Sequence, residues 1–410
     1  MLPALLALLL LLLPRGADGR LRGAGVTKPD YSYYHKTDEV FAMYESYQSA
    51  GCPVMRIQRV SDASGSYKVD SSMVVTVTGA GGDATKKAGV AIGFGEHGRE
   101  LISAEIGMRL LAMFCAPWAE SHGKLPADLA PHHALAMAGL ALHKRELSWV
   151  AHLLDRVVFK LIPIENPNGR KIVEGGKLCH RMNGRKVDIN RNFDIHFGIH
   201  PPEYLPSEEY EGTAAFSEPE ARITRDAAKS LMVENGGGGL HAFVAIHAGI
   251  KELYIPYDYK LEEAKGTDLH AVLDKINKAH CNCRTGSAAK IGGYKAFGTA
   301  TAYMYEVLKA KYVYTWEVVG DLTASARDCF KGFNPVTHKT YEHEVQNWAA
   351  ALLMLAEEVV ARELPAAVPS MPVAAAGSGA EVKKVATTVP TFNANHPDAN
   401  PGPRNNAEIG

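Results

Sequence analysis

Short apolar runs alternate along the chain with longer segments in which apolar residues recur at helical spacing. The short runs predict strands at residues 74–78, 89–94, 157–164, 240–247 and 312–319. Helical spacing is clearest at residues 102–114 and 349–360. Continuous apolar strands separated by helices are typical of a sheet that helices cover on both faces. The pattern therefore predicts an α/β fold, in which ligands bind beyond the carboxyl ends of the strands.

The two ends of the chain differ from the long block between them. Residues 1–19 combine a Leu- and Ala-rich stretch with a small-residue cleavage sequence, and we interpret them as a signal peptide. Residues 365–410 are rich in Ala, Pro, Gly, Val and Asn and have no sustained period, which predicts a disordered tail. No Pro- or Ser-rich linker interrupts the block, so we expect one folded domain at residues 28–364.

Composition narrows the class of protein. Among 410 residues, 44 Lys and Arg oppose 45 Asp and Glu, and this balance gives no electrostatic reason to expect a nucleic-acid partner. The longest apolar stretch, residues 2–13, is shorter than the roughly 20 residues of a membrane-spanning helix, so we expect no membrane span. Six cysteines fit disulfides in the secretory pathway, and we expect a secreted or lumenal protein. For Cys281 and Cys283 we favour a disulfide or free thiols over a metal site.

A candidate metal site begins where the strand at residues 89–94 runs into His97, Arg99 and Glu100 and then into a helix. An imidazole and a carboxylate three residues apart at such a turn can face one point and supply ligands to zinc. The strand at residues 240–247 ends in His247, and His241 lies about 20 Å before it along the strand. His97, Glu100 and His247 therefore form a candidate site for one Zn²⁺, with a fourth position open for water.

The same turn also matches a different motif. Residues 93–98 satisfy G-x-G-x-x-G, the fingerprint of a dinucleotide site, which would indicate an NAD-dependent dehydrogenase. In that case Glu96 would lie in the turn that holds the pyrophosphate and would repel it. The acidic residue that should end a strand about 20 residues later is also missing. We therefore favour the metal site.

Polar residues follow other predicted strands as well. Glu317 ends the strand KYVYTWE among apolar neighbours, where a carboxylate can act as a general base or as a salt-bridge partner. The turn NPNG is followed by Arg181 and by the motif DINRNF, which contains Asn190 and Arg191. These arginines could be surface cations. However, a guanidinium beside an amide suits the bidentate capture of a carboxylate.

These segments together resemble the zinc metallocarboxypeptidase family of the carboxypeptidase A/B type. HGRE, NPNG, DINRNF, FSEPE, a strand ending in His247 and KYVYTWE occur in this order, and the resemblance covers roughly residues 33–361. It implies a single α/β/α domain with a mixed, mostly parallel, eight-stranded central sheet. It also implies an exopeptidase that removes the C-terminal residue of peptides or proteins.

The resemblance implies a role for each candidate residue. His97, Glu100 and His247 match the zinc ligands, and Glu317 matches the general base that activates water. Arg181 matches the arginine that stabilises the oxyanion, with Arg185 as its local competitor.

The substrate-binding residues follow from the same resemblance. Asn190 and Arg191 match the pair that binds the substrate's terminal carboxylate, and Arg99 matches an auxiliary arginine. Tyr294 matches the mobile tyrosine that closes over the substrate, and Tyr303 is the weaker candidate.

Substrate preference depends on Asp258. It falls where relatives that remove C-terminal Lys or Arg carry an acid, whereas the position near Thr301 lacks the acid of pancreatic B-type enzymes. We expect a preference for basic C-terminal residues. The alternative within the same family is a non-catalytic protein that binds peptides.

Three further expectations concern organisation. His97 lies too close to the N-terminus for an inhibitory pro-domain, and only the predicted tail follows the domain, so we expect neither a pro-domain nor a second folded module. Residues 116–148 exceed what the family pattern needs. We also expect a monomer whose substrates are peptide or protein C-termini.

Overall fold

A computed structural model of the chain describes residues 26–83, 86–123, 125–200, 208–234 and 239–364. The predicted signal peptide and the predicted C-terminal tail lie outside these residues. The strands are β1 (Met55–Ser64), β2 (Tyr67–Val77), β3 (Ala88–Phe94), β4 (Val157–Ile162), β5 (Leu240–His247), β6 (Glu252–Ile255), β7 (Arg284–Ser287) and β8 (Tyr312–Glu317).

Helices connect most of these strands. They are α1 (Thr37–Ser49), α2 (Leu101–His122), α3 (Leu129–Leu142), α4 (Leu147–Leu154), α5 (Pro167–Glu174), α6 (Pro219–Glu234), α7 (Thr267–Ile276), α8 (Ala288–Ile291), α9 (Ala300–Glu306), α10 (Cys329–Phe333) and α11 (His338–Glu363). The 3₁₀ turn η2 (Ile189–Arg191) and the π-helical turn η3 (Asn277–Cys281) complete the set.

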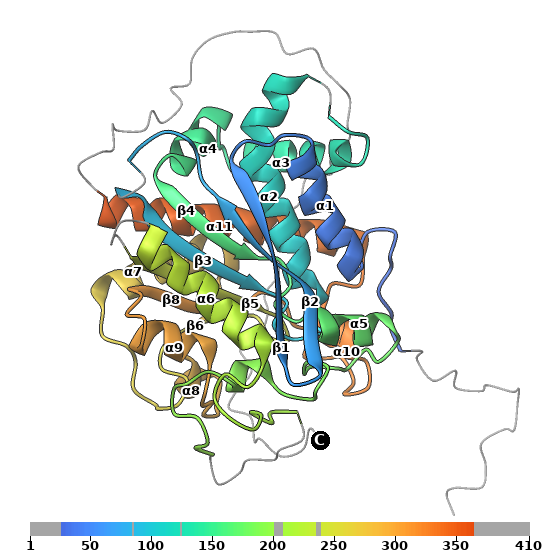
Figure 1. Ribbon diagram of the computed structural model, residues 1–410, viewed down its shortest axis with the longest axis vertical. Coiled ribbons are helices and arrows are strands. Elements are labelled where there is room, and N and C mark those ends of the chain that lie inside the picture. The colour runs from blue at the N-terminus through green and yellow to red at the C-terminus, as the bar shows by residue number, and fades with distance from the viewer. Residues whose placement is uncertain (1–25, 84–85, 124, 201–207, 235–238, 365–410) are drawn as a thin grey trace, which may run out of the picture.

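The strands form one sheet in the order β1-β2-β4-β3-β5-β8-β6-β7 (Figure 1). The central strands β4, β3, β5 and β8 run parallel to one another. Antiparallel pairs flank them, with β1 and β2 on one side and β6 on the other, while β6 and β7 are parallel. Four of the seven pairs are parallel, so the described residues confirm the mixed, mostly parallel, eight-stranded sheet.

Helices cover both faces of this sheet, which confirms the α/β/α architecture. Along β5, Val244 and Ile246 point into a core that α2 and α11 complete. Phe243 and Ala245 point to the opposite side, into a second core with residues of α6 and α9. This alternation arises because successive side chains of a strand point to opposite faces. In Figure 1, α6 crosses one face of the sheet and α11 runs along the other.

Helix α2 is the central helix of the larger core. Its apolar residues recur all round the helix, and 89% of its most apolar 18-residue window is buried inside the protein. It is the only helix among the described residues that is long and apolar enough to cross a membrane. Such burial is typical of the core helix of a globular protein. The stretch at residues 116–148, which the family pattern left unexplained, forms the end of α2, then α3, and the start of α4.

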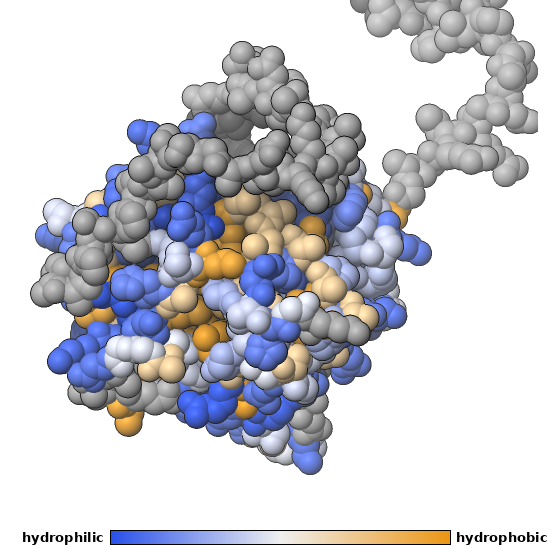
Figure 2. All heavy atoms as spheres, turned by 90° about the horizontal axis from the view of Figure 1, so that it is seen from above, coloured by the Kyte–Doolittle hydropathy of each residue, from blue (hydrophilic) through white to orange (hydrophobic). Residues whose placement is uncertain are grey.

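The surface seen from above Figure 1 is mostly hydrophilic, with hydrophobic side chains gathered near its centre (Figure 2). The end of α2, together with α3 and α4, lies toward this side in Figure 1. Helix α3 has few polar residues, and its Leu142 is 70% exposed. The apolar sequence of α3 thus supplies both a core face and part of this surface.

All six cysteines form disulfides, which pair Cys52 with Cys115, Cys179 with Cys329 and Cys281 with Cys283. The expectation of disulfides is confirmed, and Cys281 and Cys283 belong to no metal site. Cys179 and Cys329 lie 150 residues apart in sequence. Their bond ties the segment before Arg181 to α10.

Candidate active site

The candidate residues gather where the central parallel strands end at one edge of the sheet. His97 and Glu100 follow β3, and Glu100 is the residue before the first turn of α2. His247 is the last residue of β5 and pairs in register with Glu317, the last residue of β8. Because parallel strands end at the same edge, the sheet brings these four residues together.

Three side chains that could bind a metal converge in the interior of the protein. His97 Nδ1 lies 2.7 Å from Glu100 Oε1 and 3.1 Å from His247 Nδ1. His247 Nδ1 lies 3.0 Å from Glu100 Oε2. All three side chains are almost fully buried. The two imidazoles therefore present the same kind of nitrogen to one point, next to a carboxylate.

This donor set fits zinc. Two imidazole nitrogens and a carboxylate oxygen are the ligands of many catalytic zinc sites, and bonds of about 2.0–2.2 Å place tetrahedral ligands about 3.3 Å apart. The observed separations of 2.7 to 3.1 Å need only a small adjustment to reach that value. Burial alone would raise the pKa of Glu100, but the two histidines lower it below its ordinary value, so its carboxylate is ready to bind a cation.

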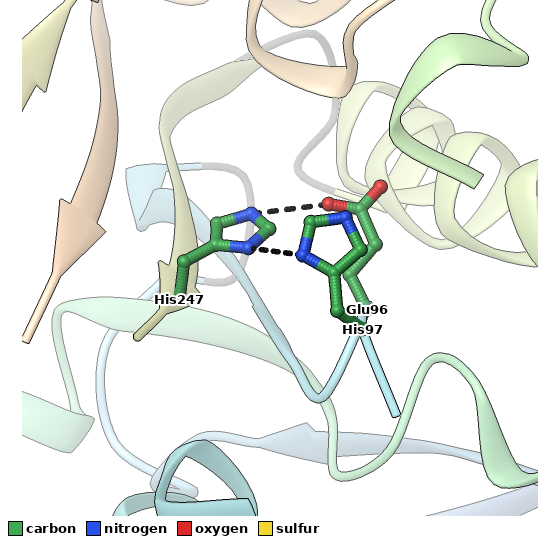
Figure 3. A group of neighbouring side chains, drawn as sticks. All are labelled: Glu96, His97 and His247. Atoms are coloured by element: carbon green, nitrogen blue, oxygen red, sulfur yellow. Dashed lines mark hydrogen bonds and ion pairs between the residues drawn. The ribbon is translucent and has the colours of Figure 1, made fainter. Parts of the chain in front are cut away.

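A second carboxylate lies beside the other ring nitrogen of His247. Glu96, His97 and His247 also form a group whose ligand atoms lie within 4.8 Å of one another (Figure 3). In this group Glu96 Oε2 lies 3.1 Å from His247 Nε2, whereas His97 and Glu100 lie at Nδ1. In the sequence, Glu96 is recognisable only as an obstacle to a bound dinucleotide. The burial of Glu96 against His247 leaves that dinucleotide interpretation without support.

Asp188 organises the residues beside the histidines. Its Oδ1 lies 3.2 Å from His97 Nε2, and its Oδ2 accepts hydrogen bonds from Arg181 Nε and Nη2. Burial would raise the pKa of Asp188, but Arg181 and Arg191 outweigh this effect and hold it well below its usual range. Asp188 lies in the motif DINRNF, yet no role was predicted for it.

Glu317 is partly buried beside the metal-ligand group. Its Oε2 atom is buried without a hydrogen-bond partner among the described residues. Burial raises the pKa of Glu317 to about 7, although the neighbouring histidines and Arg181 oppose the shift. A carboxylate with such a pKa can exchange a proton near neutral pH.

A pocket of about 510 Å³ opens beside these groups and brings together most of the predicted residues. Its lining includes His97, Arg181, Asn190, Arg191, His247, Asp258, Tyr294 and Glu317. Tyr294 is 51% exposed at this site.

Two acidic residues pair with the predicted substrate-binding arginines Arg191 and Arg99. Arg191 Nη2 donates to Glu209 Oε1 at 3.0 Å, and Arg99 Nη1 donates to Glu208 Oε2 at 3.0 Å. Arg99 is not among the residues that line the pocket, and its guanidinium stacks on Phe333. Of the ten predicted site residues, Arg99 and Glu100 are the two that do not line this pocket.

Asp258 is a buried acid in the pocket wall. The hydroxyl groups of Thr299 and Thr301 both donate to its Oδ2 atom. Burial raises the pKa of Asp258, and the two hydroxyl groups oppose that shift. The threonines therefore fix one oxygen and the orientation of the carboxylate.

The weaker sequence candidates lie elsewhere. Gly89 N donates to His241 Nδ1 at the opposite end of β5 from His247. Arg185 lies 3.6 Å from Glu218 and does not line the pocket. Tyr303 packs in the core between Phe193 and Phe216.

The fold and this site define an α/β protein with a buried two-histidine, one-carboxylate metal centre at the carboxyl edge of its sheet. The sequence pattern of the family described as zinc carboxypeptidase matches residues 54–350. The chain belongs to the zinc carboxypeptidase family. This confirms the resemblance seen in the sequence, and zinc is the metal of the family.

Individual relatives match only part of their length. Mouse carboxypeptidase A2 is 28% identical over 185 residues, which cover 41% of this chain and 42% of the relative. Human carboxypeptidase A1 is 32% identical over 141 residues, which cover 32% of this chain and 31% of the relative. The chain thus spans less than half the length of these curated relatives in the matched regions.

Solved structures share the fold over a larger part of the chain. Bovine thrombin-activatable fibrinolysis inhibitor, in a complex with tick carboxypeptidase inhibitor, has a TM-score of 0.57 at 20% identity and covers 80% of this chain and 98% of its own. Carboxypeptidase A from Helicoverpa armigera has a TM-score of 0.59 at 19% identity and covers 81% of this chain and 75% of its own.

Proposed function

We propose that this protein is a zinc-dependent exopeptidase that removes the C-terminal residue of peptides or proteins. The observation that carries the proposal is the convergence of His97 Nδ1, His247 Nδ1 and the Glu100 carboxylate beside Glu317 and a pocket lined by Arg181 and Arg191. A metal centre, a base and a carboxylate-binding arginine are the parts that C-terminal hydrolysis needs. Family membership supports the same reaction.

His97, Glu100 and His247 would hold the metal, and zinc bound there would lower the pKa of a water molecule and polarise the scissile carbonyl. Glu317 accepts the proton of the attacking water, and it then delivers a proton to the nitrogen of the leaving amino acid. Its raised pKa of about 7 suits both transfers near neutral pH.

Arg181 stabilises the negative charge that develops on the carbonyl oxygen. It lines the pocket, and two hydrogen bonds to Asp188 Oδ2 hold its guanidinium in place. A donor fixed before the reaction costs no reorganisation when the charge appears.

Arg191 and Asn190 bind the terminal carboxylate of the substrate. Arg191 is held by Asn190 O and lies close to Asp188, and Asn190 Oδ1 accepts from Ala300 N, so its amide NH₂ group is left for the substrate. Tyr294, half-exposed in the same pocket, closes over the bound carboxylate. Arg99 does not line this pocket, and its role as an auxiliary substrate-binding arginine rests on the family resemblance alone.

Asp258 gives the pocket a preference for C-terminal Lys or Arg. It is a buried carboxylate in the pocket wall, and Thr299 and Thr301 hold it through Oδ2. A cationic side chain would neutralise this buried charge, which an apolar side chain would leave without a cation.

The proposal includes residues 28–364 as the catalytic domain and secretion as the route of the protein. Three disulfides among the described residues fit an oxidising compartment. The monomeric state stays a prediction.

The decisive experiment is Glu317→Gln, which keeps the shape of the side chain but cannot accept the proton. We expect hydrolysis of a peptide with C-terminal Arg to fall by a factor of about 10²–10⁴ while the protein still binds one equivalent of zinc. Glu363→Gln, which removes a carboxylate paired with Lys311 away from the pocket, is the matched control and should stay active. A wild-type protein that binds zinc and peptides but cleaves none would instead identify the non-catalytic alternative.

A further inference from the structure

Each of the two ligand histidines turns its second ring nitrogen toward a different buried carboxylate. His97 Nε2 lies 3.2 Å from Asp188 Oδ1, and His247 Nε2 lies 3.1 Å from Glu96 Oε2. In Figure 3, Glu96 and His97 lie side by side, and each contacts a different nitrogen of the His247 ring. Each imidazole thus has a carboxylate near its Nε2 atom, and the two carboxylates come from different segments of the chain.

The setting of Glu96 is unusual for a carboxylate. It is 1% exposed, and neither of its oxygens has a hydrogen-bond partner among the described residues. Burial of an ionised carboxylate is costly unless a charged or donating group compensates it. The only such group at ion-pair distance among the described residues is the His247 ring, whose Nε2 is likewise buried without an aligned hydrogen bond.

We propose that Glu96 is the positioning residue of the zinc ligand His247. An acceptor at Nε2 keeps the proton on that nitrogen and leaves Nδ1 free for the metal, which fixes the tautomer and the ring orientation. The proposal rests on the proposed function only in taking His97, Glu100 and His247 as the zinc ligands.

Glu96 acts through His247 and not as a ligand itself. Its carboxylate contacts Nε2 of His247. The other ring nitrogen, Nδ1, lies beside His97 Nδ1 and a Glu100 oxygen. One imidazole offers a single nitrogen to a given ion. Glu96 and Glu100 therefore have separate tasks at the two ends of the same ring.

Zinc affinity tests the proposal without any substrate. Zinc dissociation constants are measured by chelator competition for the full chain and for Glu96→Gln and Glu96→Leu. We expect Glu96→Leu to weaken zinc binding by roughly 10–100-fold and Glu96→Gln, which keeps an acceptor oxygen, to weaken it less. Glu105→Gln breaks another buried carboxylate–histidine contact, with His35, and as the matched control should bind zinc like the wild type.

A spectroscopic readout separates positioning from a structural effect. With ¹⁵N-labelled histidine, the Nε2–H proton of His247 should shift in the zinc-bound Glu96→Leu protein, while that of His97, held by Asp188, should not. Unchanged zinc affinity in both Glu96 variants, or an equal loss in Glu105→Gln, would overturn the proposal. Loss of zinc binding in Glu96→Gln as complete as in Glu100→Gln would make Glu96 a ligand and would also overturn it. A wild-type chain that binds no zinc would instead refute the proposed function.

Discussion

Asp188 holds Arg181 through two hydrogen bonds to a single oxygen, Oδ2, at 3.0 Å from Nε and 2.8 Å from Nη2. Because the other oxygen lies 3.2 Å from His97 Nε2, one carboxylate orients both a proposed zinc ligand and the proposed oxyanion-binding arginine.

Asp188→Asn should therefore impair two functions together. The amide retains one acceptor oxygen and loses the charge, so we expect zinc to bind roughly 10–100-fold more weakly and kcat to fall even at saturating zinc. Asp62→Asn removes a carboxylate that pairs with Arg222 away from the site and should change neither. Parallel zinc titrations and kinetics check this, and a variant with weaker zinc binding but wild-type kcat at saturating zinc would separate Arg181 from Asp188.

Asp258→Asn should reduce the preference for basic residues. We expect kcat/KM for a peptide with C-terminal Arg to fall roughly 10–100-fold, because a charge-assisted contact contributes about 1.5–3 kcal/mol. The matched peptide ending in Phe should be cleaved as well as before or better. Thr301→Val, which removes one hydroxyl that donates to Asp258, should have a smaller effect in the same direction. If the wild type cleaves the Phe peptide as well as the Arg peptide, Asp258 does not set the preference.

The pH dependence of hydrolysis should follow Glu317. Its pKa is raised to about 7 by burial, and it must be deprotonated to accept a proton from water. The value of kcat/KM should therefore rise with pH below about 7 and level off above it. Measuring the profile with a Phe peptide in the Asp258→Asn variant removes the titration of Asp258 from the result. A flat profile between pH 5 and 8 would contradict this assignment.

Glu209→Gln should lower KM without changing kcat. Glu209 is partly exposed, and its side chain pairs with Arg191, the residue proposed to bind the substrate carboxylate. Loss of this competing anion should lower KM by up to about fivefold, the limit set by an exposed ion pair of 0–1 kcal/mol. High salt should diminish the difference. Glu208→Gln, the neighbouring change beside Arg99, serves as the control, and an equal decrease in KM there would argue against direct competition at Arg191.

Removing the disulfide between Cys179 and Cys329 should destabilise the domain. This bond closes a loop of about 150 residues, whereas Cys281 and Cys283 are only two residues apart. We expect the Cys179→Ser, Cys329→Ser double variant to lose about 2–5 kcal/mol of stability. Without the bond, the long loop gains conformational entropy in the unfolded chain, which favours unfolding. The corresponding double variant of Cys281 and Cys283 should lose much less. Urea unfolding followed by circular dichroism measures both, and equal losses would contradict the loop-entropy argument.

The sequence predicted the centre of the fold better than its edges. Strands β3, β4, β5 and β8 match the predicted apolar runs because most of their residues are buried on both faces, whereas the predicted run at residues 74–78 covers only the last part of β2. In contrast, β1 is an edge strand with many exposed residues, and β6 and β7 have four residues each. Strands so short or so exposed lack a continuous apolar run, so hydrophobic pattern alone does not reveal them.

The candidate site shows a similar limit. Residues with recognisable motif neighbours, such as His97, Arg191 and Glu317, were predicted and lie at one pocket. Glu96 has no such motif role, and it contacts His247 because β3 and β5 are neighbours in the sheet. Nothing in the local sequence of Glu96 distinguishes a carboxylate that faces His247 from one at the surface.

The register between β5 and β8 has a consequence for how the substrate preference of such a protein can change. His247 and Glu317 are placed opposite each other by backbone hydrogen bonds, and a slip of one residue would turn Glu317 to the other face of the sheet. The segment between the two strands carries Asp258, Tyr294 and Thr299. Replacements or insertions there can reshape the pocket while both strand ends stay fixed. The residues proposed to set substrate preference thus lie on a different part of the chain from the proposed ligand His247 and the proposed base Glu317, and one part can be redesigned without rebuilding the other.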